Sequence, residues 1–379
     1  MTIGAVIAII GVVVWATILL LPWQPWSTRE RLDANGCNHV LNPDDITALV
    51  PARNESSTIA ETLRGLTAQH RNIQIVLVDD QSTDGTADAA RSVSQCNLKL
   101  VQGKPLPQDW VGKMWALDQG FAEVSTENVL LIDADIKLEP GMLAAMKHKM
   151  DSDNIDFLSL MVALRMDSFW ERLLMPAFVY FFKLLYPFRL SNNPQVQGIA
   201  AGAGGCILLK AELVRKIGGF GSLKDILIDD CALAKRAKKL GYRTWIGLTH
   251  SACSTRVYES LGSIWNMVAR NAFTELKYSV VRLLICTVLM VIIFWSPIAG
   301  LLIPGLVPKV AALCALILMM LSYCPTLRFY GMRFFWALAL PLIGSLYLAM
   351  TWSSAIRYWL GRRFRWRGRL YGNRGMGHT

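Results

Sequence analysis

Acidic residues follow three separate apolar segments that are predicted to be β-strands. If these strands are parallel, their carboxyl ends lie at one edge of one sheet, and the acidic side chains gather there. Without a cation they would repel each other, whereas a divalent metal, the hydroxyl groups of a sugar or ribose, or a base amide would satisfy them. Oxygen ligands of this kind favour Mg²⁺ or Mn²⁺. The residues at the three strand ends are Pro51, Arg53 and Glu55, then Asp79 and Asp80, then Asp133 and Asp135.

The simplest explanation of an aspartate after a strand is a cap on the next helix, and it suits Asp84 and Asp80. It does not suit Asp133 and Asp135, which follow the apolar segment 129–132 with only an alanine between them. Two carboxylates at the end of a buried strand are costly unless they bind something. We therefore interpret this pair as part of a site for a metal and a nucleotide.

The elements that position these residues alternate between strands and helices. Short β-branched segments predict strands at 46–50, 73–78, 98–102 and 128–132. The helices between them are predicted to begin near Ser57, Thr86, Gly112 and Gly141, with Thr58 and Glu61 as a capping box for the first. This alternation predicts an α/β fold with a mostly parallel, Rossmann-like sheet.

A second motif lies further along the chain. Glycines at 202, 204 and 205 precede the pair Asp229-Asp230, which opens a predicted helix running to Leu240. The glycines either allow close packing or make room for an acceptor molecule. Asp230 alone would be explained as an acidic residue in the first turn of a helix.

In order and spacing, these motifs and Gly112-Lys113 resemble family 2 glycosyltransferases with the GT-A fold, over about residues 45–280. The resemblance implies an inverting transfer from a nucleotide sugar, most often a UDP-sugar. It implies that Asp79 and Asp80 contact uracil and ribose, that Asp133 contacts the ribose or the sugar, and that Asp135 binds the metal. Asp230 matches the catalytic base, and the acceptor region would include Gly204, Gly205 and Asp229. The other residues of the nucleotide-sugar site would be Pro51, Arg53, Glu55, Lys113 and Arg270.

One motif departs from the family. Many members carry Gln-x-x-Arg-Trp on a helix at the membrane, and the corresponding stretch here is 270–274. Arg270 is its only cation, and Phe273 and Thr274 stand in the places of Arg and Trp. This argues against a processive polysaccharide synthase. Arg270 is explained equally well as a ligand of the diphosphate and as a surface residue.

The composition indicates a membrane protein. Hydrophobic residues make up 53% of the chain, and its net charge of +11 arises after Glu275, where twelve basic residues and no acidic ones follow. This excess accompanies the apolar part of the chain and indicates a lipid surface as the partner, with no nucleic acid. The eight cysteines form no C-x-x-C pair, which argues against a zinc site.

Four uncharged segments are long enough to cross a bilayer: 3–21, 283–308, 310–327 and 334–356. Pro297, Pro304 and Pro308 are expected to shorten the second, and Pro341 is expected to kink the last. Arg29 and Arg31 place residues 30–280 in the cytoplasm, and hence the protein in the inner (cell) membrane as a multi-pass protein. Three later spans would leave the arginine-rich tail outside against the same rule, so the number of spans stays open.

The expected domains are an N-terminal anchor (1–24), a GT-A domain (40–280), C-terminal membrane helices (281–358) and a basic tail (359–379). The apolar segment 169–188 has two explanations. It is either a buried helix of the soluble domain or, as 168–188, a helix at the membrane interface with its aromatic side chains down and its charges up.

This layout resembles lipid glycosyltransferases. It is most similar to the hopene-associated (HpnB-type) group, through residues 268–276 and the Trp-Arg-Gly-Arg tail at 366–369. Ceramide and carotenoid glycosyltransferases share the plan more loosely. The resemblance implies a UDP-sugar donor and a membrane lipid acceptor, with a link to hopanoid synthesis. A membrane nucleotidyl- or phosphosugar transferase and a non-catalytic lipid-binding relative are the alternatives.

Overall fold

The computed structural model describes residues 3–34, 39–93, 97–224, 226, 229–361, 364–366 and 369–371. The chain divides into two compact units. The sheet unit comprises Glu30–Arg165, Leu190–Val257 and Arg365–Thr379, and the helical unit comprises Met1–Arg29, Met166–Arg189 and Tyr258–Phe364. The domain boundaries expected from the sequence stay predictions. Among the described residues of the sheet unit, Asp229 is described by its backbone alone.

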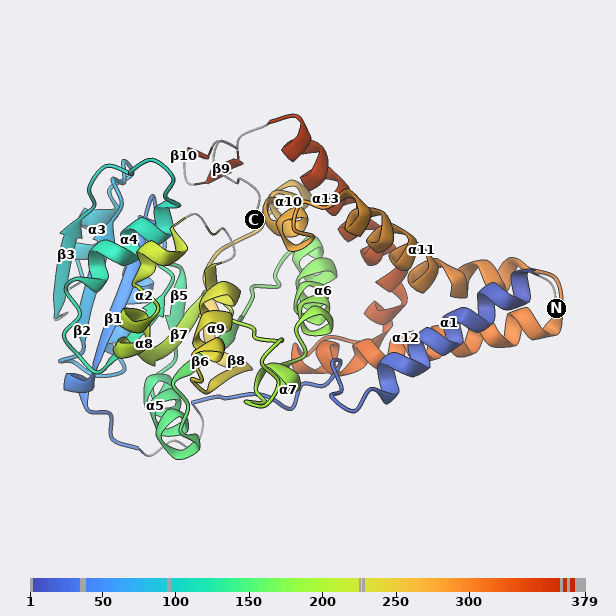
Figure 1. The fold of residues 1–379 in the computed structure, drawn as a ribbon, viewed down its shortest axis with the longest axis horizontal. Coiled ribbons are helices and arrows are strands. Elements are labelled where there is room, and N and C mark those ends of the chain that lie inside the picture. Colours follow the sequence, from blue (N-terminus) through green and yellow to red (C-terminus); the bar gives the residue numbers. More distant parts are fainter. Residues whose placement is uncertain are drawn as a thin grey trace. The chain divides into compact units, whose positions relative to one another are not determined.

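The described part of the sheet unit is built on a mixed sheet of eight strands in the order β3-β2-β1-β4-β7-β6-β8-β5. Figure 1 shows β3, β2 and β1 side by side at one edge of this sheet. The parallel pairs are β1–β2, β1–β4, β2–β3 and β6–β8, whereas β7 runs antiparallel to β4 and β6, and β5 to β8. The predicted Rossmann-like, mostly parallel sheet is therefore confirmed. Its strands are β1 (Ile46–Ala52), β2 (Gln74–Asp79), β3 (Leu98–Gln102), β4 (Asn128–Ile132), β5 (Ile136–Leu138), β6 (Phe157–Ala163), β7 (Cys206–Lys210) and β8 (Thr244–Ser254).

Helices cover both faces of this sheet, which explains why its central strands are apolar throughout. Ala48 and Val50 of β1 pack into one core cluster, and Leu49 between them packs into the other. The first cluster is closed by α2 (Ile59–Thr67), α3 (Thr86–Arg91) and α5 (Met142–Asp153). The second is closed by α4 (Gly112–Phe121), α8 (Ala211–Lys216), α9 (Asp229–Lys239) and the 3₁₀ helix η2 (Phe220–Leu223). A further 3₁₀ turn, η1 (Pro43–Asp45), leads into β1.

The predicted capping box at the start of α2 is wrong. Thr58 is the N-cap residue, but its side chain makes no capping hydrogen bond. Its hydroxyl instead donates to the carbonyl oxygen of Glu55 at 3.3 Å and to Glu55 Oε2 at 3.1 Å. Glu61 pairs with Lys137 of β5 at 2.9 Å. A local partner, Glu55, has therefore taken the side chain of Thr58, and a tertiary partner, Lys137, has taken that of Glu61.

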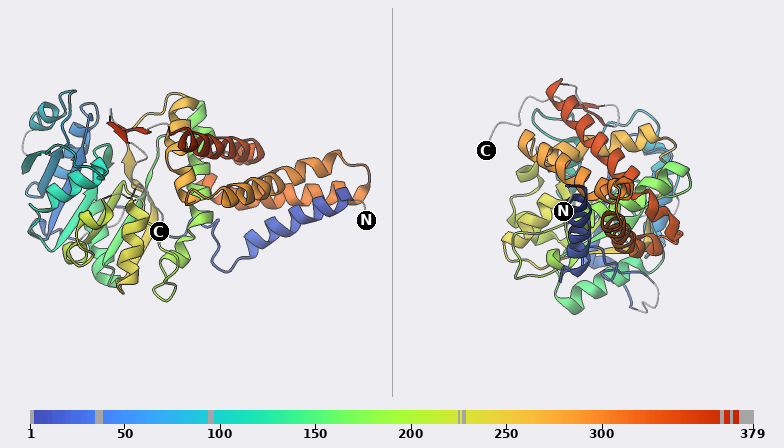
Figure 2. Two further views of the ribbon diagram at one scale, coloured as in Figure 1. Left: turned by 45° about the horizontal axis from the view of Figure 1, so that its top comes forward. Right: turned by 90° about the vertical axis from the view of Figure 1, so that its right-hand side faces the viewer.

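The helical unit contains α1 (Ile3–Leu20), α6 (Phe169–Leu185), α10 (Leu261–Glu275), α11 (Val280–Leu302), α12 (Leu306–Phe329), η3 (Phe334–Ala339) and α13 (Leu340–Trp359). Figure 2 shows α1, α11 and α12 running side by side. Three helical stretches are long and apolar enough to cross a membrane, namely Val280–Leu302, Leu306–Phe329 and Phe334–Trp359. The described part of α1, Val6–Leu20, is apolar but shorter. Short elements complete the described chain: α7 (Phe188–Ser191), and the paired strands β9 (Phe364–Trp366) and β10 (Arg369–Tyr371).

Prolines set the ends of these helices. Helix α11 continues past Pro297 and ends two residues before Pro304, and Pro308 lies in the first turn of α12. The segment 334–356 changes from the 3₁₀ helix η3 to α13 directly before Pro341, which lies in the first turn of α13. The kink predicted at Pro341 stays a prediction. An N–H in the first turn has no partner within the helix, so proline there costs nothing.

Helix α6 belongs to the helical unit. Its start is fixed by a capping box in which Ser168 and Glu171 exchange hydrogen bonds. The expectation that its charges point up into water is wrong for Glu171 and Lys183, which are both fully buried. Lys183 Nζ donates to the carbonyl oxygen of Trp26 and to Thr326 Oγ1, each at 3.4 Å. The placement of α6 at a membrane interface stays a prediction.

Candidate functional site

An ion pair lies just beyond the carboxyl end of β4. Asp133 is the first residue after the strand, and Lys113 comes from the first turn of α4. Lys113 Nζ lies 2.7 Å from Asp133 Oδ1, and both side chains are partly exposed. The same Nζ donates to the carbonyl oxygen of Gly204 at 3.4 Å, so the cation joins the β4 end to the glycine-rich segment. Two residues predicted for the nucleotide-sugar site are therefore in contact.

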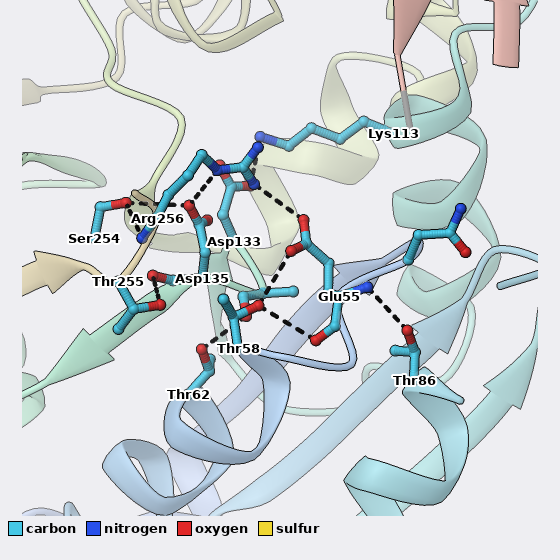
Figure 3. A network of polar contacts seen from close by, with 12 residues as sticks. Glu55, Thr58, Thr62, Thr86, Lys113, Asp133, Asp135, Ser254, Thr255 and Arg256 are labelled. Carbon is cyan, nitrogen blue, oxygen red and sulfur yellow. Dashed lines mark hydrogen bonds and ion pairs between the residues drawn. The ribbon is translucent and has the colours of Figure 1, made fainter. Parts of the chain in front are cut away.

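The second aspartate of the pair is held by a cation that the sequence analysis missed. Arg256 Nε donates to Asp135 Oδ2 at 2.8 Å, and Ser254 Oγ donates to the same oxygen at 3.1 Å. Arg256 Nη2 reaches Glu55 Oε1 at 3.0 Å, so one guanidinium joins two acidic residues from different strand ends (Figure 3). Thr255 donates its N–H to the carbonyl oxygen of Asp135 at 2.7 Å. The β8 end is thereby fixed against the β4 end.

These contacts correct one premise of the sequence analysis, which treated the carboxylates as lacking a counter-ion within the protein. Lys113 and Arg256 supply two positive charges at Asp133, Asp135 and Glu55. Opposite charges within about 4 Å stabilise the ionised carboxylates. The acidic cluster is therefore compatible with a folded protein before any ligand binds, and its presence alone does not require a metal.

Side chains hold the loop after β2 through hydrogen bonds to its main-chain atoms. Arg53 Nη1 donates to the carbonyl oxygens of Asp80 and Gln81, the second at 3.1 Å. Asp79 Oδ1 accepts the N–H of Ser82 at 3.0 Å, which closes the turn that follows the strand. In these contacts Arg53 and Asp79 shape the loop. Roles for Arg53, Asp79 and Asp80 in binding a nucleotide stay predictions.

Asp84 contributes to the same turn. It accepts the N–H of Thr86 at 3.1 Å and the N–H of Ser56 at 3.0 Å, so it joins the loops after β1 and β2. Burial raises the pKa of Asp84, but hydrogen bonds from Thr86 and Ser56 outweigh this, and the net pKa is lowered. The carboxylate therefore stays ionised while it holds the two loops together.

Asp230 lies in the first turn of α9, directly beside the glycine-rich segment. Its Oδ2 accepts the N–H of Gly204 at 2.7 Å, and its Oδ1 accepts the N–H of Cys231 at 2.8 Å. A Cβ at Gly202 would lie 2.6 Å from the carbonyl oxygen of Asp230, so only glycine fits at that position. A Cβ at Gly204 would lie 3.2 Å from Lys113 Nζ and 3.3 Å from Asp230 Oδ2. The missing side chain of Gly204 therefore leaves the ammonium and carboxylate close together.

A small pocket opens between these elements. Its polar lining comes from Lys113, Asp133 and Asp230, and its apolar lining includes Leu117, Phe220 and Leu223. The residues predicted from the sequence that line it are Pro51, Lys113, Asp133, Gly204 and Asp230. A cation, an acid at a strand end and an acid at a helix start thus face one space.

Three further residues were predicted for the site, namely Gly205, Asp229 and Arg270. Gly205 packs against Val162, which a Cβ there would approach to 3.3 Å. The side chain of Asp229 lies outside the described part of the chain. Arg270 is on α10 of the helical unit, where its Nε donates to Asn271 Oδ1 at 3.3 Å. The roles of all three residues stay predictions.

The described residues contain no cluster of three or more His, Cys, Asp or Glu side chains that could hold a metal ion. The two hydrogen bonds described for the Asp135 carboxylate both end on Oδ2. Oδ1 therefore fits a metal that takes its other ligands from the phosphate oxygens of a donor and from water, as Mg²⁺ commonly does. The residues present fit a metal bound together with a donor better than a metal bound by the protein alone.

A buried lysine fixes α9, which carries Asp230. Lys238 Nζ donates to the carbonyl oxygens of Leu190, Ser191 and Ile199 at 3.2, 2.6 and 2.8 Å. Burial lowers the pKa of Lys238 to about 8. Its partners lie just before the glycine-rich segment, so the lysine sets the position of that segment against α9.

Comparison with known proteins finds a family that part of the chain resembles. Residues 47–218 match the model of glycosyl transferase family 2. A 4,4'-diaponeurosporenoate glycosyltransferase of Staphylococcus aureus is 32% identical over 114 residues, which cover 29% of this chain and 28% of that protein. The chain thus matches less than a third of the length of this relative. The resemblance to family 2 glycosyltransferases is confirmed for this region, whereas the closer likeness to the hopene-associated group stays a prediction.

A solved structure extends the comparison to the fold. A mannosyltransferase from Pyrobaculum calidifontis, in complex with GDP-Man and Mn²⁺, superposes with a TM-score of 0.57 at 19% identity. The alignment covers 95% of this chain and all of that chain. The predicted GT-A fold is therefore confirmed.

Proposed function

We propose that this protein is a membrane glycosyltransferase that moves one sugar from a nucleotide sugar to a lipid hydroxyl group. The observation that carries the proposal is the pocket in which Lys113, Asp133 and Asp230 face one space, within a domain of glycosyl transferase family 2. Donors of this type carry a diphosphate and a sugar rich in hydroxyl groups. Lys113 would bind the diphosphate, and Asp133 would accept hydrogen bonds from the ribose or sugar.

Asp230 is proposed as the general base of an inverting transfer. Displacement at the anomeric carbon needs a carboxylate that takes the proton of the acceptor hydroxyl on the face opposite the leaving diphosphate. The N–H groups of Gly204 and Cys231 hold the two carboxylate oxygens of Asp230 in a fixed orientation. A base that does not have to reorient lowers the cost of reaching the reactive geometry.

Asp135 would hold the divalent metal, Mg²⁺ or Mn²⁺, through Oδ1. When bound, the metal supplies charge that stabilises the leaving diphosphate. Asp79 and Asp80 are proposed to contact uracil and ribose, which makes a UDP-sugar the expected donor. The relative crystallised with a nucleotide sugar and Mn²⁺ supports a metal, although its donor is GDP-Man.

A lipid acceptor is supported by the apolar helices of the same chain. Three stretches of the helical unit are long and apolar enough to cross a membrane. A hydrophobic alcohol does not leave the bilayer at useful concentration, so its glycosyltransferase has to act at the membrane surface. The S. aureus relative is named for the glycosylation of 4,4'-diaponeurosporenoate, a carotenoid, and this also supports an apolar acceptor. We propose a cytoplasmic orientation of the sheet unit and an acceptor from lipid or hopanoid synthesis.

The test is an assay of the purified full-length protein with Mn²⁺ or Mg²⁺, a panel of UDP- and GDP-sugars, and a lipid extract of the native membrane. We expect one lipid to gain the mass of one hexosyl residue while a nucleoside diphosphate is released. Release of pyrophosphate or a nucleoside monophosphate would instead show a nucleotidyl- or phosphosugar transferase. Absence of donor binding and of any turnover would favour a lipid-binding relative without catalysis.

A further inference from the structure

A guanidinium already occupies the carboxylate that is proposed to bind the metal. Arg256 lies between Asp135 and Glu55, with contacts of 2.8 and 3.0 Å (Figure 3). The two carboxylate side chains are only 8% and 9% exposed, whereas the arginine is 32% exposed. The cation therefore reaches from the solvent side into a pair of buried acids.

We infer that Arg256 makes metal binding at Asp135 depend on the nucleotide-sugar donor. The inference rests on the proposed function, in which Asp135 binds a divalent metal. A guanidinium and a dication that share one carboxylate repel each other, and partial burial strengthens this repulsion compared with water. In the absence of donor, Arg256 therefore weakens the binding of the metal.

The donor relieves this repulsion because it supplies negative charge. Its diphosphate offers the guanidinium a second anionic partner, and arginine binds phosphate oxygens with the same planar fork that it uses for carboxylates. Arg256 can shift toward the diphosphate and still keep its contact with Glu55, because separate nitrogens bind the two acids. The metal is then paired with Asp135, and the diphosphate is paired with Arg256.

Glu55 is built to retain the arginine during such a shift. Its Oε2 accepts a hydrogen bond from Thr58 Oγ1 at 3.1 Å, and its own N–H donates to Thr86 Oγ1 at 2.9 Å. Thr58, at the start of α2, thus holds the carboxylate, and Thr86 of α3 holds the main chain of Glu55, both independently of Asp135. Glu55 acts as a positioning residue for Arg256, whereas Asp135 exchanges one cation for another.

The consequence is a measurable coupling between two ligands. If the donor strengthens metal binding, the metal must strengthen donor binding by the same factor. We expect UDP to lower the Kd of Mn²⁺ about thirtyfold in the wild type, which lies within the range observed for coupled sites. The site is therefore expected to bind Mn²⁺ far more tightly when the nucleotide is present than when it is absent.

The experiment measures Mn²⁺ binding to the purified full-length protein by the electron paramagnetic resonance signal of free Mn²⁺, with and without saturating UDP. For Arg256→Gln we expect Mn²⁺ alone to bind about tenfold more tightly, and the effect of UDP to fall to about threefold. Arg256→Lys keeps a cation and should retain most of the coupling. Arg91→Gln is the matched control, since it makes the same change in an exposed ion pair with Asp88 on α3.

The outcomes separate the inference from the function on which it rests. If Arg256→Gln binds Mn²⁺ alone no more tightly than the wild type, Arg256 merely orients Asp135 and the inference is overturned, while the proposed function stands. Loss of coupling in Arg256→Lys to the level of Arg256→Gln would also overturn it, because charge would not be the cause. If the wild type binds neither UDP nor Mn²⁺ with UDP, the proposed function fails and the inference fails with it. Equal unfolding midpoints establish that all variants are folded.

Discussion

The sheet unit and the helical unit both bury acidic side chains, but they satisfy them by different means. In the sheet unit, Asp135 and Glu55 share the guanidinium of Arg256, which is 32% exposed. In the helical unit, Glu171 accepts the backbone N–H groups of Asp167 at 3.0 Å, Ser168 at 2.9 Å and Tyr258 at 2.7 Å. In the first arrangement side-chain carboxylates pair with a side-chain cation. In the second, a carboxylate accepts hydrogen bonds from backbone N–H groups.

This difference separates exchangeable charges from structural ones. A side-chain cation at a partly exposed site can turn toward a phosphate, because a metal ion from solution can take its place beside the carboxylate. Backbone N–H groups around a fully buried carboxylate have no such replacement, and removal of that carboxylate leaves buried donors without acceptors. We therefore expect changes in the sheet unit to alter binding and changes around Glu171 to alter stability.

Asp230 combines features of both regions, because it lines the pocket and yet backbone N–H groups bind its carboxylate. The largest effect is expected at this residue. We expect Asp230→Asn to reduce transfer at least about a thousandfold, since a general base contributes up to 10⁴-fold. Binding of UDP should remain within about threefold of the wild type, because the amide preserves the shape of the side chain. The assay is lipid glycosylation by mass spectrometry, with Asp88→Asn on the exposed face of α3 as the control. Full turnover by the variant would remove the assignment of the base.

Removal of the metal sharpens the comparison. We expect a chelator to lower transfer about a hundredfold and added Mn²⁺ to restore it, since the metal stabilises charge on the leaving group. The thermal unfolding midpoint should not change, because Lys113 and Arg256 neutralise the carboxylates without a metal. A chelator that lowers the midpoint by several degrees would show that the metal is structural.

Substitution of the buried glutamate should have the opposite pattern. Glu171→Gln places an NH₂ group where backbone donors now meet a carboxylate oxygen, and this should cost about 2 kcal/mol in the free energy of unfolding. Chemical denaturation in detergent measures the loss, and Glu259→Gln at an exposed position is the control. Donor and Mn²⁺ affinity of the folded protein should stay unchanged. An effect on Mn²⁺ affinity equal to that of Arg256→Gln would abolish the distinction between the two regions.

Lys238 gives an effect on stability that depends on pH. Its folded-state pKa of about 8 lies below the ordinary value of 10.5, so the unfolded chain binds the proton more tightly. The cost of burying this charge is complete below pH 8 and disappears as the pH rises toward 10.5. We expect the stability of the wild type relative to Lys238→Met to rise over that interval. Denaturation curves at pH 7.5, 9 and 10 test this, and a constant difference would contradict it.

The sequence was most informative where local pattern and topology coincide. Apolar segments with β-branched residues predicted the four parallel strands, and parallel strands necessarily bring their carboxyl ends to one edge. This placed Asp133 at the edge of the sheet in advance, whereas Lys113, which pairs with it, entered the predicted site only through the family resemblance. The capping box at Thr58 failed because Glu61 found a tertiary partner in Lys137, which no local rule could anticipate.

Arg256 and Lys238 show the limit of such inference. Arg256 lies 121 residues after Asp135, at the end of a strand that was not predicted, so the contact depends on where β8 pairs within the sheet. Lys238 belongs to a basic run that is typical of a solvated helix face, yet it is buried under three carbonyl groups. The only feature of the sequence that pointed to Arg256 was its position after an apolar segment. The acidic residues of the site were identified by the same criterion.

The bond between Asp230 and the N–H of Gly204 ties a reactive group to the main chain rather than to another side chain. Substitutions can therefore reshape the walls of the pocket, including Leu117, Phe220 and Leu223, without dislodging the carboxylate. Under the proposed function, variants of this apolar wall would change the sugar that is accepted while Asp230 keeps its place. At position 204 an added methyl group would lie 3.2 Å from Lys113 Nζ and 3.3 Å from Asp230 Oδ2, so it would press on both charged groups.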